Sequence, residues 1–188
     1  MERASAKISR ALVIFIGLVI FVKYLSGTGL FEPKNHRGHG YSVSIPQGWK
    51  KVKKQKGVVY PKGVEVVLFV PKGTDVKTEE PDTYISVFTK KLETPAWIED
   101  EFPGILESIK REGNRVMDKG EIKLDDVISQ WVVYYSQKHD ALFLEFYIVT
   151  DANVFYKMQY SAPSEVFNKL RPSFEELKES FKFRFSLS

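Results

Sequence analysis

Three consecutive runs of β-branched and aromatic residues, separated by two short polar turns, form the most regular pattern in the chain. The runs cover residues 127–137, 141–150 and 153–161, and the turns contain QKHD and DAN. Residues of these types favour strands, while Asp and Asn favour the tight turns that join them. The stretch from Val127 to Ser161 is therefore predicted to form an antiparallel meander.

The middle run is apolar on both faces of the predicted strand. One face consists of Leu142, Leu144, Phe146 and Ile148, and the other of Phe143, Glu145, Tyr147 and Val149. A strand with two apolar faces is covered on both sides, so we expect helices or long loops on each face of the sheet. In the third run Phe155, Lys157 and Gln159 occupy one face, which predicts a less buried position for that strand.

Shorter alternating runs extend the sheet. Strands are predicted at 41–45, in a hairpin of 58–60 with 64–70, at 83–90, at 115–124 and, closing the fold, at 181–185. Pro and Gly in the segments between these runs provide the turns. These runs make the folded part a mixed α+β domain built on an antiparallel sheet.

Two helices are predicted. The first follows a short initial turn at Thr94-Pro95 and runs from about Pro103 to Glu112, because Pro103-Gly104 interrupts the earlier pattern. The second carries an apolar stripe at helical spacing, Phe167, Leu170, Phe174, Leu177 and Phe181. Pro172 is expected to break or kink it, and Ser173 with Glu176 fits a capping box for a fresh start. The stripe is expected to cover the sheet.

An unbroken apolar run, Ala11–Val22, follows three basic residues near the amino terminus. With Arg10 and Lys23 at the two interfaces, the apolar stretch extends from Ile8 to Leu25 and approaches the length of a membrane span. Residues 1–29, with their apolar core at 11–25, are therefore either a cleavable signal peptide or an uncleaved signal anchor, and we favour the anchor. Both alternatives place the remainder outside the cytoplasm.

The distribution of charge and the absence of cysteine exclude several kinds of site. Most of the formal net charge of +4 lies in the leader, so the basic composition does not predict a nucleic-acid partner. The chain has no cysteine, which excludes disulfides, thiolate metal sites, catalytic thiols and an acylated amino-terminal cysteine. No cofactor is predicted.

Two groups of potential metal ligands are interpreted as solvated surface residues. His36 and His39 lie in the polar segment 30–40, which is predicted to be a linker before the domain at 41–188, and we expect both to be solvated. Glu99, Asp100 and Glu101 lack the alternating spacing of a calcium loop and are predicted to form a solvated helix face. No metal site is therefore predicted.

Two surface features are candidates for interaction. The lysine run suits anionic lipid or acidic partners, although lysines on an edge strand also prevent aggregation. His139-Asp140 lies in a turn of the meander, but no Ser or Cys motif accompanies it, so a hydrolase dyad is unsupported. The candidate residues are Lys50, Lys51, Lys53, Lys54, Lys56, His139 and Asp140.

The pattern of strand, turn and aromatic residues resembles the PsbP-like superfamily. The resemblance is carried by YSVSIPQGW at 41–49, TYISVFTKK at 83–91, FYKMQYSAP at 155–163 and FEELKESFKF at 174–183. The superfamily includes photosystem PsbP proteins, DcrB-type bacterial envelope lipoproteins and a nuclear protein that binds the GTPase Ran. The resemblance implies an α/β/α sandwich around a central antiparallel sheet, over about residues 40–185. The lipoproteins' acylated cysteine is missing here, and a membrane-embedded leader would replace it.

Two functions from different classes fit these observations. The first is a non-catalytic binding or assembly module, tethered to the outer face of the cytoplasmic membrane and bound to an envelope protein. The second is an extracytoplasmic ligand-binding or enzymatic domain with a pocket between sheet and helix. Its polar groups would come from Tyr134, His139, Glu145 and Tyr147. The missing catalytic motif favours the first, so the protein is not expected to be an enzyme.

Overall fold

The computed structural model describes residues 34–52, 61–76 and 81–184. The predicted leader, residues 1–29, lies outside them. The chain divides into two compact units, Met1–Lys34 and Asn35–Ser188, and the second is the folded domain. Its elements are β1 (Asn35–Gly38), β2 (Tyr41–Ser44), β3 (Trp49–Lys51), β4 (Val64–Pro71), β5 (Tyr84–Lys91), α2 (Ile98–Arg111), β6 (Arg115–Leu124), β7 (Val127–Ser136), β8 (Ala141–Val149), β9 (Val154–Pro163), α3 (Ser164–Glu179) and β10 (Lys182–Phe183). Neither α2 nor α3 is long and apolar enough to cross a membrane.

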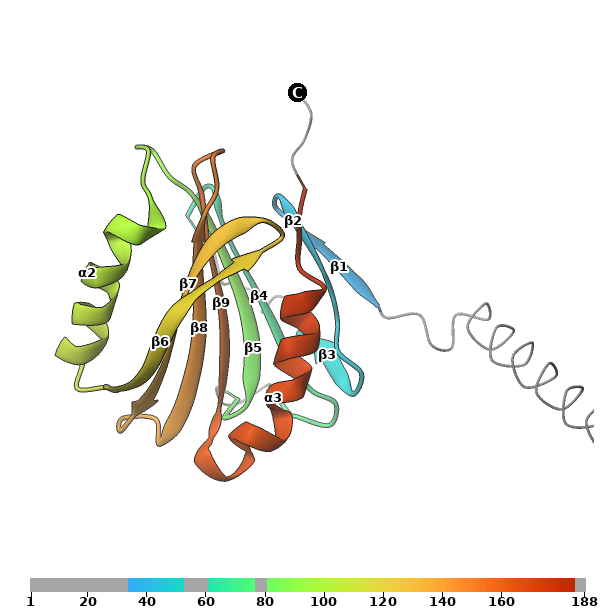
Figure 1. The fold of residues 1–188 in the computed structure, drawn as a ribbon. Helices are drawn as coiled ribbons and strands as arrows, with labels where there is room; N and C mark the ends of the chain where they lie inside the picture. Colours follow the sequence, from blue (N-terminus) through green and yellow to red (C-terminus); the bar gives the residue numbers. More distant parts are fainter. Residues whose placement is uncertain (1–33, 53–60, 77–80, 185–188) are drawn as a thin grey trace, which may run out of the picture. The chain divides into compact units, whose positions relative to one another are not determined.

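A seven-stranded antiparallel sheet organises the domain, in the order β3-β4-β5-β9-β8-β7-β6 (Figure 1). The predicted meander is confirmed as β7, β8 and β9, with β6 added before it. Its turns place Asp125, Asp126, Asp140 and Asn153 at positive φ, where short polar side chains are tolerated best. Strand β4 pairs with β3 and β5, and residues 58–60, which were predicted to form a hairpin with it, lie outside the described part.

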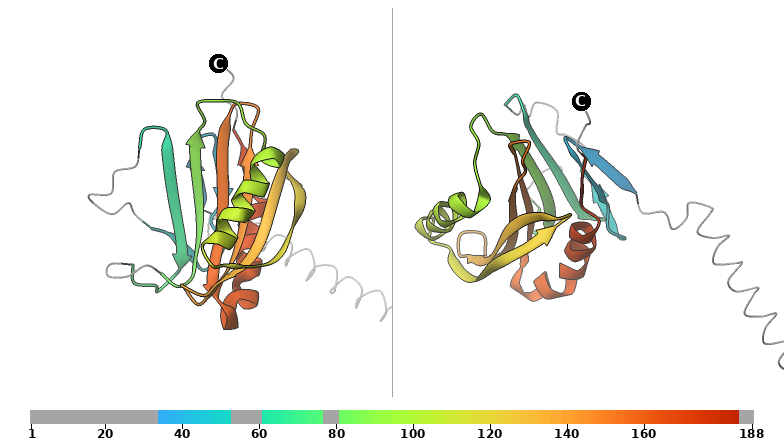
Figure 2. Two further views of the ribbon diagram at one scale, coloured as in Figure 1. Left: turned by 90° about the vertical axis from the view of Figure 1, so that its left-hand side faces the viewer. Right: turned by 45° about the horizontal axis from the view of Figure 1, so that its top comes forward.

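The two faces of β8 support two separate cores, as predicted. Phe146 packs against Phe174 of α3, and Tyr147 packs against Phe102 of α2. The large sheet therefore lies between the two helices (Figure 1), and the left view of Figure 2 shows α2 in front of it. This arrangement is an α/β/α sandwich, in which burial of apolar side chains on both sides stabilises the sheet.

Strand β9 occupies a central position in the large sheet. It is the fourth of seven strands, paired with β5 on one side and β8 on the other. Gln159 is consequently buried, whereas Phe155 and Lys157 are partly exposed. Strand β9 is nevertheless less buried than β8, as its polar positions predicted. Its pairing with β5, far away in the sequence, cannot be inferred from alternation within β9.

Helix α2 begins at Ile98, earlier than predicted, and continues through Pro103. Its buried residues Ile98, Phe102, Leu106 and Ile109 form one stripe that spans the proline. A proline inside a helix costs about 3 kcal/mol, while each large apolar side chain that becomes buried contributes about 1.5–3 kcal/mol. Packing on the sheet therefore outweighs the lost backbone hydrogen bond.

Helix α3 confirms the predicted stripe but not the predicted break. Phe167, Phe174 and Leu177 are buried, and the helix runs without interruption through Pro172. An ion pair between Arg171 and Glu175, 3.1 Å long, spans this point. No new helix starts at Ser173, so the predicted capping box does not form.

A second sheet of three strands, β1-β2-β10, packs beside α3 (Figure 1). Residues 35–38 were assigned to a linker by their polar composition, yet they form β1, paired with β2 in the register Asn35↔Ser44. The closing strand predicted at 181–185 is present as Lys182–Phe183. Figure 2 (right) shows this sheet next to α3, and its buried residues join the same core as the helix.

Candidate functional site

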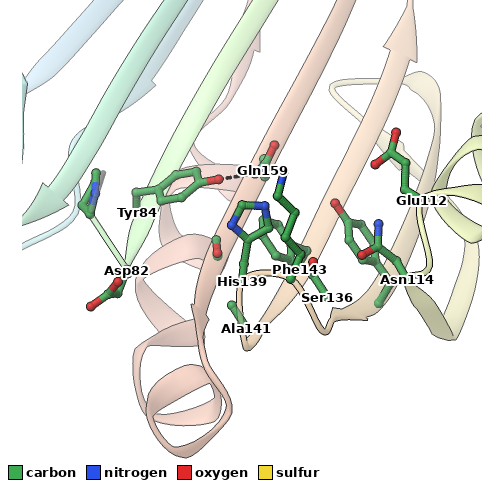
Figure 3. A pocket seen from close by; sticks show the side chains of 13 residues that line it. Asp82, Tyr84, Glu112, Asn114, Ser136, His139, Ala141, Phe143 and Gln159 are labelled. Atoms are coloured by element: carbon green, nitrogen blue, oxygen red, sulfur yellow. Dashed lines mark hydrogen bonds between the residues drawn. The ribbon is translucent and has the colours of Figure 1, made fainter. Parts of the chain in front are cut away.

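A cavity of about 530 Å³ lies on the α2 face of the large sheet, beside the carboxyl end of α2. Its floor comes from strands β5, β9, β8 and β7, and its walls come from the end of α2 and the β7–β8 turn (Figure 3). The lining residues are Pro81, Asp82, Tyr84, Glu112, Asn114, Tyr134, Ser136, Lys138, His139, Ala141, Phe143, Gln159 and Ser161.

Strand register explains why these residues meet. Tyr84 pairs with Ser161, Ser161 with Phe143, and Phe143 with Tyr134. Directly paired residues point to the same face of a sheet, so these four side chains form one row across four strands. The cavity floor is therefore a direct product of the sheet order.

Aromatic rings form much of the floor. Tyr134 and Phe143 stack with a centroid distance of 5.0 Å and an interplanar angle of 3°. The ring of His139 meets Phe143 edge-on at 6.0 Å. Figure 3 shows His139 over Phe143, with Tyr84 on the opposite side of the cavity. Rings locked by such contacts provide a preformed apolar surface.

Polar side chains surround this apolar surface. The Gln159 amide donates a hydrogen bond to the Tyr84 hydroxyl at 2.5 Å, drawn as the dashed line in Figure 3. Asp82, Glu112 and Asn114 lie toward the rim (Figure 3). An apolar floor with a few polar groups is the usual composition of a binding site for a small molecule or for a side chain of a partner.

A buried carboxyl group lies next to the floor. Glu145 is 2% exposed and accepts hydrogen bonds from the hydroxyls of Tyr134, at 3.2 Å, and Tyr147. Lys157 forms an ion pair with it at 3.3 Å. Burial, reinforced by the Glu145 charge, raises the pKa of both tyrosines above their ordinary value. Both hydroxyls therefore stay protonated and donate to the carboxylate.

Only part of the predicted pocket lining is confirmed. Tyr134 and His139 line the cavity, whereas Glu145 and Tyr147 do not. Tyr134 connects the two groups, because its ring belongs to the floor and its hydroxyl binds Glu145. Tyr84 and Gln159 also line the cavity but were not predicted to, because their strands come together only through the β5–β9 pairing.

His139 and Asp140 do not act as a pair. The Asp140 carboxylate accepts a 2.6 Å hydrogen bond from the Tyr135 hydroxyl. Tyr135 follows Tyr134 in β7 and so points to the opposite face of the sheet. His139 instead lies in the cavity. No hydrogen bond between a histidine and a serine hydroxyl occurs in the part of the chain that the structure describes, so a hydrolase dyad gains no support.

Two of the five lysines of the predicted surface lie within the described residues. Lys50 donates to the Thr74 carbonyl at 2.8 Å, and Lys51 lies 3.1 Å from Nδ1 of His36. The remaining lysines of the predicted surface, Lys53, Lys54 and Lys56, lie outside the described residues.

His36 differs from the prediction that both histidines are solvated. It is 7% exposed and packs edge-on against Tyr41 and Phe69, because β1 places it under the small sheet. His39 is exposed, and its backbone N–H binds Glu65. The two rings therefore do not form a metal site, and within the described ranges no group of three or more His, Asp or Glu side chains could hold a metal ion.

The acidic helix face is confirmed. Glu99, Asp100 and Glu101 occupy the exposed first turn of α2. Negative charge at a helix amino terminus interacts favourably with the helix dipole, which gives these residues a structural role.

Comparison with known proteins identifies the fold. No protein-family model matches the sequence, and no significant match was found among curated proteins. Solved structures do match. Cyanobacterial PsbP (CyanoP) from Synechocystis sp. PCC 6803 superposes with a TM-score of 0.53 at 13% identity, over 80% of this chain and 91% of that one.

Two further structures match over similar lengths. LpqN, involved in cell envelope biogenesis of Mycobacterium tuberculosis, has a TM-score of 0.52 at 10% identity and covers 81% of this chain and 86% of its own. The Saccharomyces cerevisiae Ran-binding protein Mog1p has a TM-score of 0.52 at 10% identity, with 81% and 95% covered. The two-sided sheet, its helices and these superpositions agree: the chain has the fold of the PsbP-like superfamily.

Proposed function

We propose that the protein is a non-catalytic binding or assembly module, tethered by residues 1–29 to the outer face of a cytoplasmic membrane. The fold shared with CyanoP and LpqN carries the proposal, because one of these proteins acts in cell envelope biogenesis. The basic flank and apolar core of the leader support a signal anchor, with the domain outside the cytoplasm.

A protein partner in the envelope is the expected ligand. Mog1p, which shares the fold, is a Ran-binding protein, so the architecture can serve protein recognition. The cavity beside α2 suits such a role, since its rim offers the carboxylates of Asp82 and Glu112 and its floor offers aromatic rings. Interfaces commonly centre on an anchor side chain that fills a pocket of this kind.

Membrane fractionation and affinity capture test this function. The full chain should stay with the membranes after alkaline carbonate washing, and a variant lacking residues 1–29 should not. Capture from solubilised membranes should recover one envelope protein in stoichiometric amount with both variants. Loss of that partner on the substitution Tyr134→Ala, but not on Glu99→Ala at the far end of α2, would assign the interface to the cavity. Recovery of no stoichiometric partner would refute the binding role.

A second candidate function is binding of a small ligand in the same cavity, favoured by its volume of about 530 Å³. Thermal unfolding in the presence of metabolites, lipids and divalent metals tests it, because a ligand that binds only the folded state raises the unfolding temperature. Asn114→Trp should fill the cavity and abolish the shift, while Glu99→Trp should preserve it. Absence of any shift across the compounds would eliminate this function.

A further inference from the structure

The small sheet β1-β2-β10 has two chemically opposite faces. Its inner residues, His36, Tyr41, Val43 and Phe183, are all buried against the core. The outward positions of the same strands, together with the residue after β10, are all polar and include no carboxylate. They are Asn35, Arg37, Ser42, Ser44, Lys182 and Arg184. We call this set the outer face.

The outer face is hollowed. A cavity of about 350 Å³ is lined by Asn35, Arg37, Ser42, Val43, Ser44, Ser180 and Arg184. Two strands and the segment after β10 bring the two arginines together: Arg37 pairs with Ser42, and Ser42 pairs with Lys182 on the other side. The backbone N–H of Arg184 is bonded to the Gly40 carbonyl at 2.8 Å, which fixes the chain at this edge.

The charge on the outer face is largely uncompensated. Lys182 forms an ion pair with Asp125 at 2.8 Å, but within the described ranges no ion pair involves Arg37 or Arg184. Two hydroxyls are already engaged, since Ser44 donates to Asn35 and Ser180 donates to the Leu177 carbonyl. Both guanidinium groups and the Asn35 amide N–H₂ remain as donors. The planar fork of a guanidinium group matches the geometry of phosphate oxygens.

The length of the segment between the leader and β1 limits how far the outer face can lie from the membrane. Nine residues, 26–34, separate the apolar core of the leader from β1. At about 3.3–3.6 Å per extended residue, they span at most about 30 Å. If the leader is anchored, β1 therefore starts within that distance of the membrane surface. The small sheet and α2 lie on opposite sides of the large sheet (Figure 1).

We propose that the outer face, centred on Arg37 and Arg184, binds the phosphate groups of anionic phospholipids in the leaflet that faces the domain. This inference rests on the proposed tether. Basic residues at an anionic membrane surface each strengthen attachment by about five-fold, so the two arginines together favour the docked orientation by about 30-fold. Docking through the outer face turns the cavity beside α2 away from the bilayer and toward a partner.

Quenching of a fluorophore by spin-labelled headgroups tests the orientation in full-length protein reconstituted into nanodiscs. The chain has no cysteine, so His39→Cys supplies one label in the exposed turn between β1 and β2, beside the outer face and outside its cavity. Glu99→Cys supplies a control label on α2. Nanodiscs contain either phosphatidylcholine alone or about one third phosphatidylglycerol, which provides the anionic surface. Label 39, and not label 99, should be quenched, and only with phosphatidylglycerol.

Matched variants distinguish binding at the two arginines from nonspecific attraction between a basic protein and an anionic membrane. Arg37→Gln with Arg184→Gln should reduce the quenching of label 39 to the level in phosphatidylcholine. Lys119→Gln with Lys123→Gln on β6 removes the same charge from another surface and should leave quenching unchanged. Salt at about 0.5 M, which shortens the Debye length to a few ångströms, should also abolish the phosphatidylglycerol-dependent quenching. Urea unfolding midpoints should confirm that both double variants remain folded.

Several results would overturn the proposal. Quenching that is equal in the two lipids, or that survives loss of both arginines, excludes recognition of anionic headgroups. If millimolar inorganic phosphate suppresses the quenching, the arginines bind a soluble anion and not lipid headgroups. Failure of the full chain to enter nanodiscs would refute the tether as well, whereas insertion without phosphatidylglycerol-dependent quenching refutes only the docking.

Discussion

At the scale of single residues, Glu145 shows how a buried carboxylate is accommodated between two layers. It sits on the α2 face of β8, where two tyrosine hydroxyls and Lys157 bind it. A buried charge without such partners would be strongly destabilising. The arrangement couples β7, β8 and β9 through side chains, immediately next to the cavity floor.

Replacing Glu145 by Leu should lower the free energy of unfolding by about 2 kcal/mol or more, because two buried hydroxyls lose their acceptor. Tyr134→Phe or Tyr147→Phe alone should cost less, about 0.5–1.5 kcal/mol. The triple variant should recover much of the loss, since no buried tyrosine hydroxyl is then left unpaired. Urea unfolding of the four variants measures this, and a stabilised Glu145→Leu variant would contradict the interpretation.

His36 is the second residue whose burial has a measurable consequence. Burial and the nearby charge of Lys51 lower its pKa below the ordinary value of 6.5, and Glu65 opposes this only in part. Nε2 of His36 and the Tyr41 hydroxyl have no hydrogen-bond partner in the described part of the chain. The neutral ring is therefore the form that fits beneath the small sheet.

Stability should consequently fall as the pH is lowered through the ordinary histidine range. The unfolded chain binds a proton below about pH 6.5, whereas the folded chain binds it only at a lower pH, so acidification favours unfolding. Urea midpoints at about pH 7.5 and about pH 5.5, a window in which histidines titrate, should differ. His36→Phe should remove most of the difference, and His39→Gln should retain it. An unchanged slope in His36→Phe would refute this origin.

At the scale of elements, tertiary packing decides where helices begin and end. Pro103-Gly104 predicted an interruption, but the stripe from Ile98 to Ile109 holds α2 together across both residues. Gly104 in α2 and Gly120 in β6 differ sharply in their surroundings. A Cβ at Gly104 would meet nothing within 4 Å, whereas at Gly120 in β6 it would lie 2.8 Å from the Trp131 ring.

Alanine at these two glycines should therefore have opposite effects. Gly104→Ala should raise the free energy of unfolding by about 0.5–1 kcal/mol, through the lower backbone entropy of the unfolded chain. Gly120→Ala should destabilise by about 1–3 kcal/mol, because the Trp131 ring must move from a packed position. Chemical unfolding of both variants provides the measurement, and destabilisation by Gly104→Ala would show that α2 is strained at this point.

At the scale of the whole molecule, the folded unit begins at β1. Both hydrophobic cores lie within residues 41–183, and β1 adds His36 to the packing around Tyr41 and Phe69. The boundary between the two compact units falls between Lys34 and Asn35. Residues 35–38 thus belong to the domain.

Two truncations test this boundary. A variant starting at residue 30 should unfold at the same urea concentration as the full chain, since it keeps β1 and both cores. A variant starting at residue 40 loses β1 and leaves the inner face of β2 partly uncovered, so it should lose about 2 kcal/mol or more. Equal midpoints for the two variants would show that β1 contributes nothing to stability.

Local pattern was sufficient for much of the architecture. The meander, the two apolar faces of β8 and the stripe of α3 depend on residues two to four positions apart, and the structure confirms all three. The resemblance to the PsbP-like superfamily predicted the sandwich that the superpositions support. Short-range periodicity reports directly on which side chains share a face.

The cavity and the outer face depended on the tertiary structure. Tyr84 and Gln159 are 75 residues apart in sequence, and they meet because β5 pairs with β9. Arg37 and Arg184 come together because β1 and β10 flank β2. The sequence by itself determined which residues form strands and which sides of them are apolar. The order and register of those strands depend on packing between distant segments, so only the tertiary structure decided which polar groups converge.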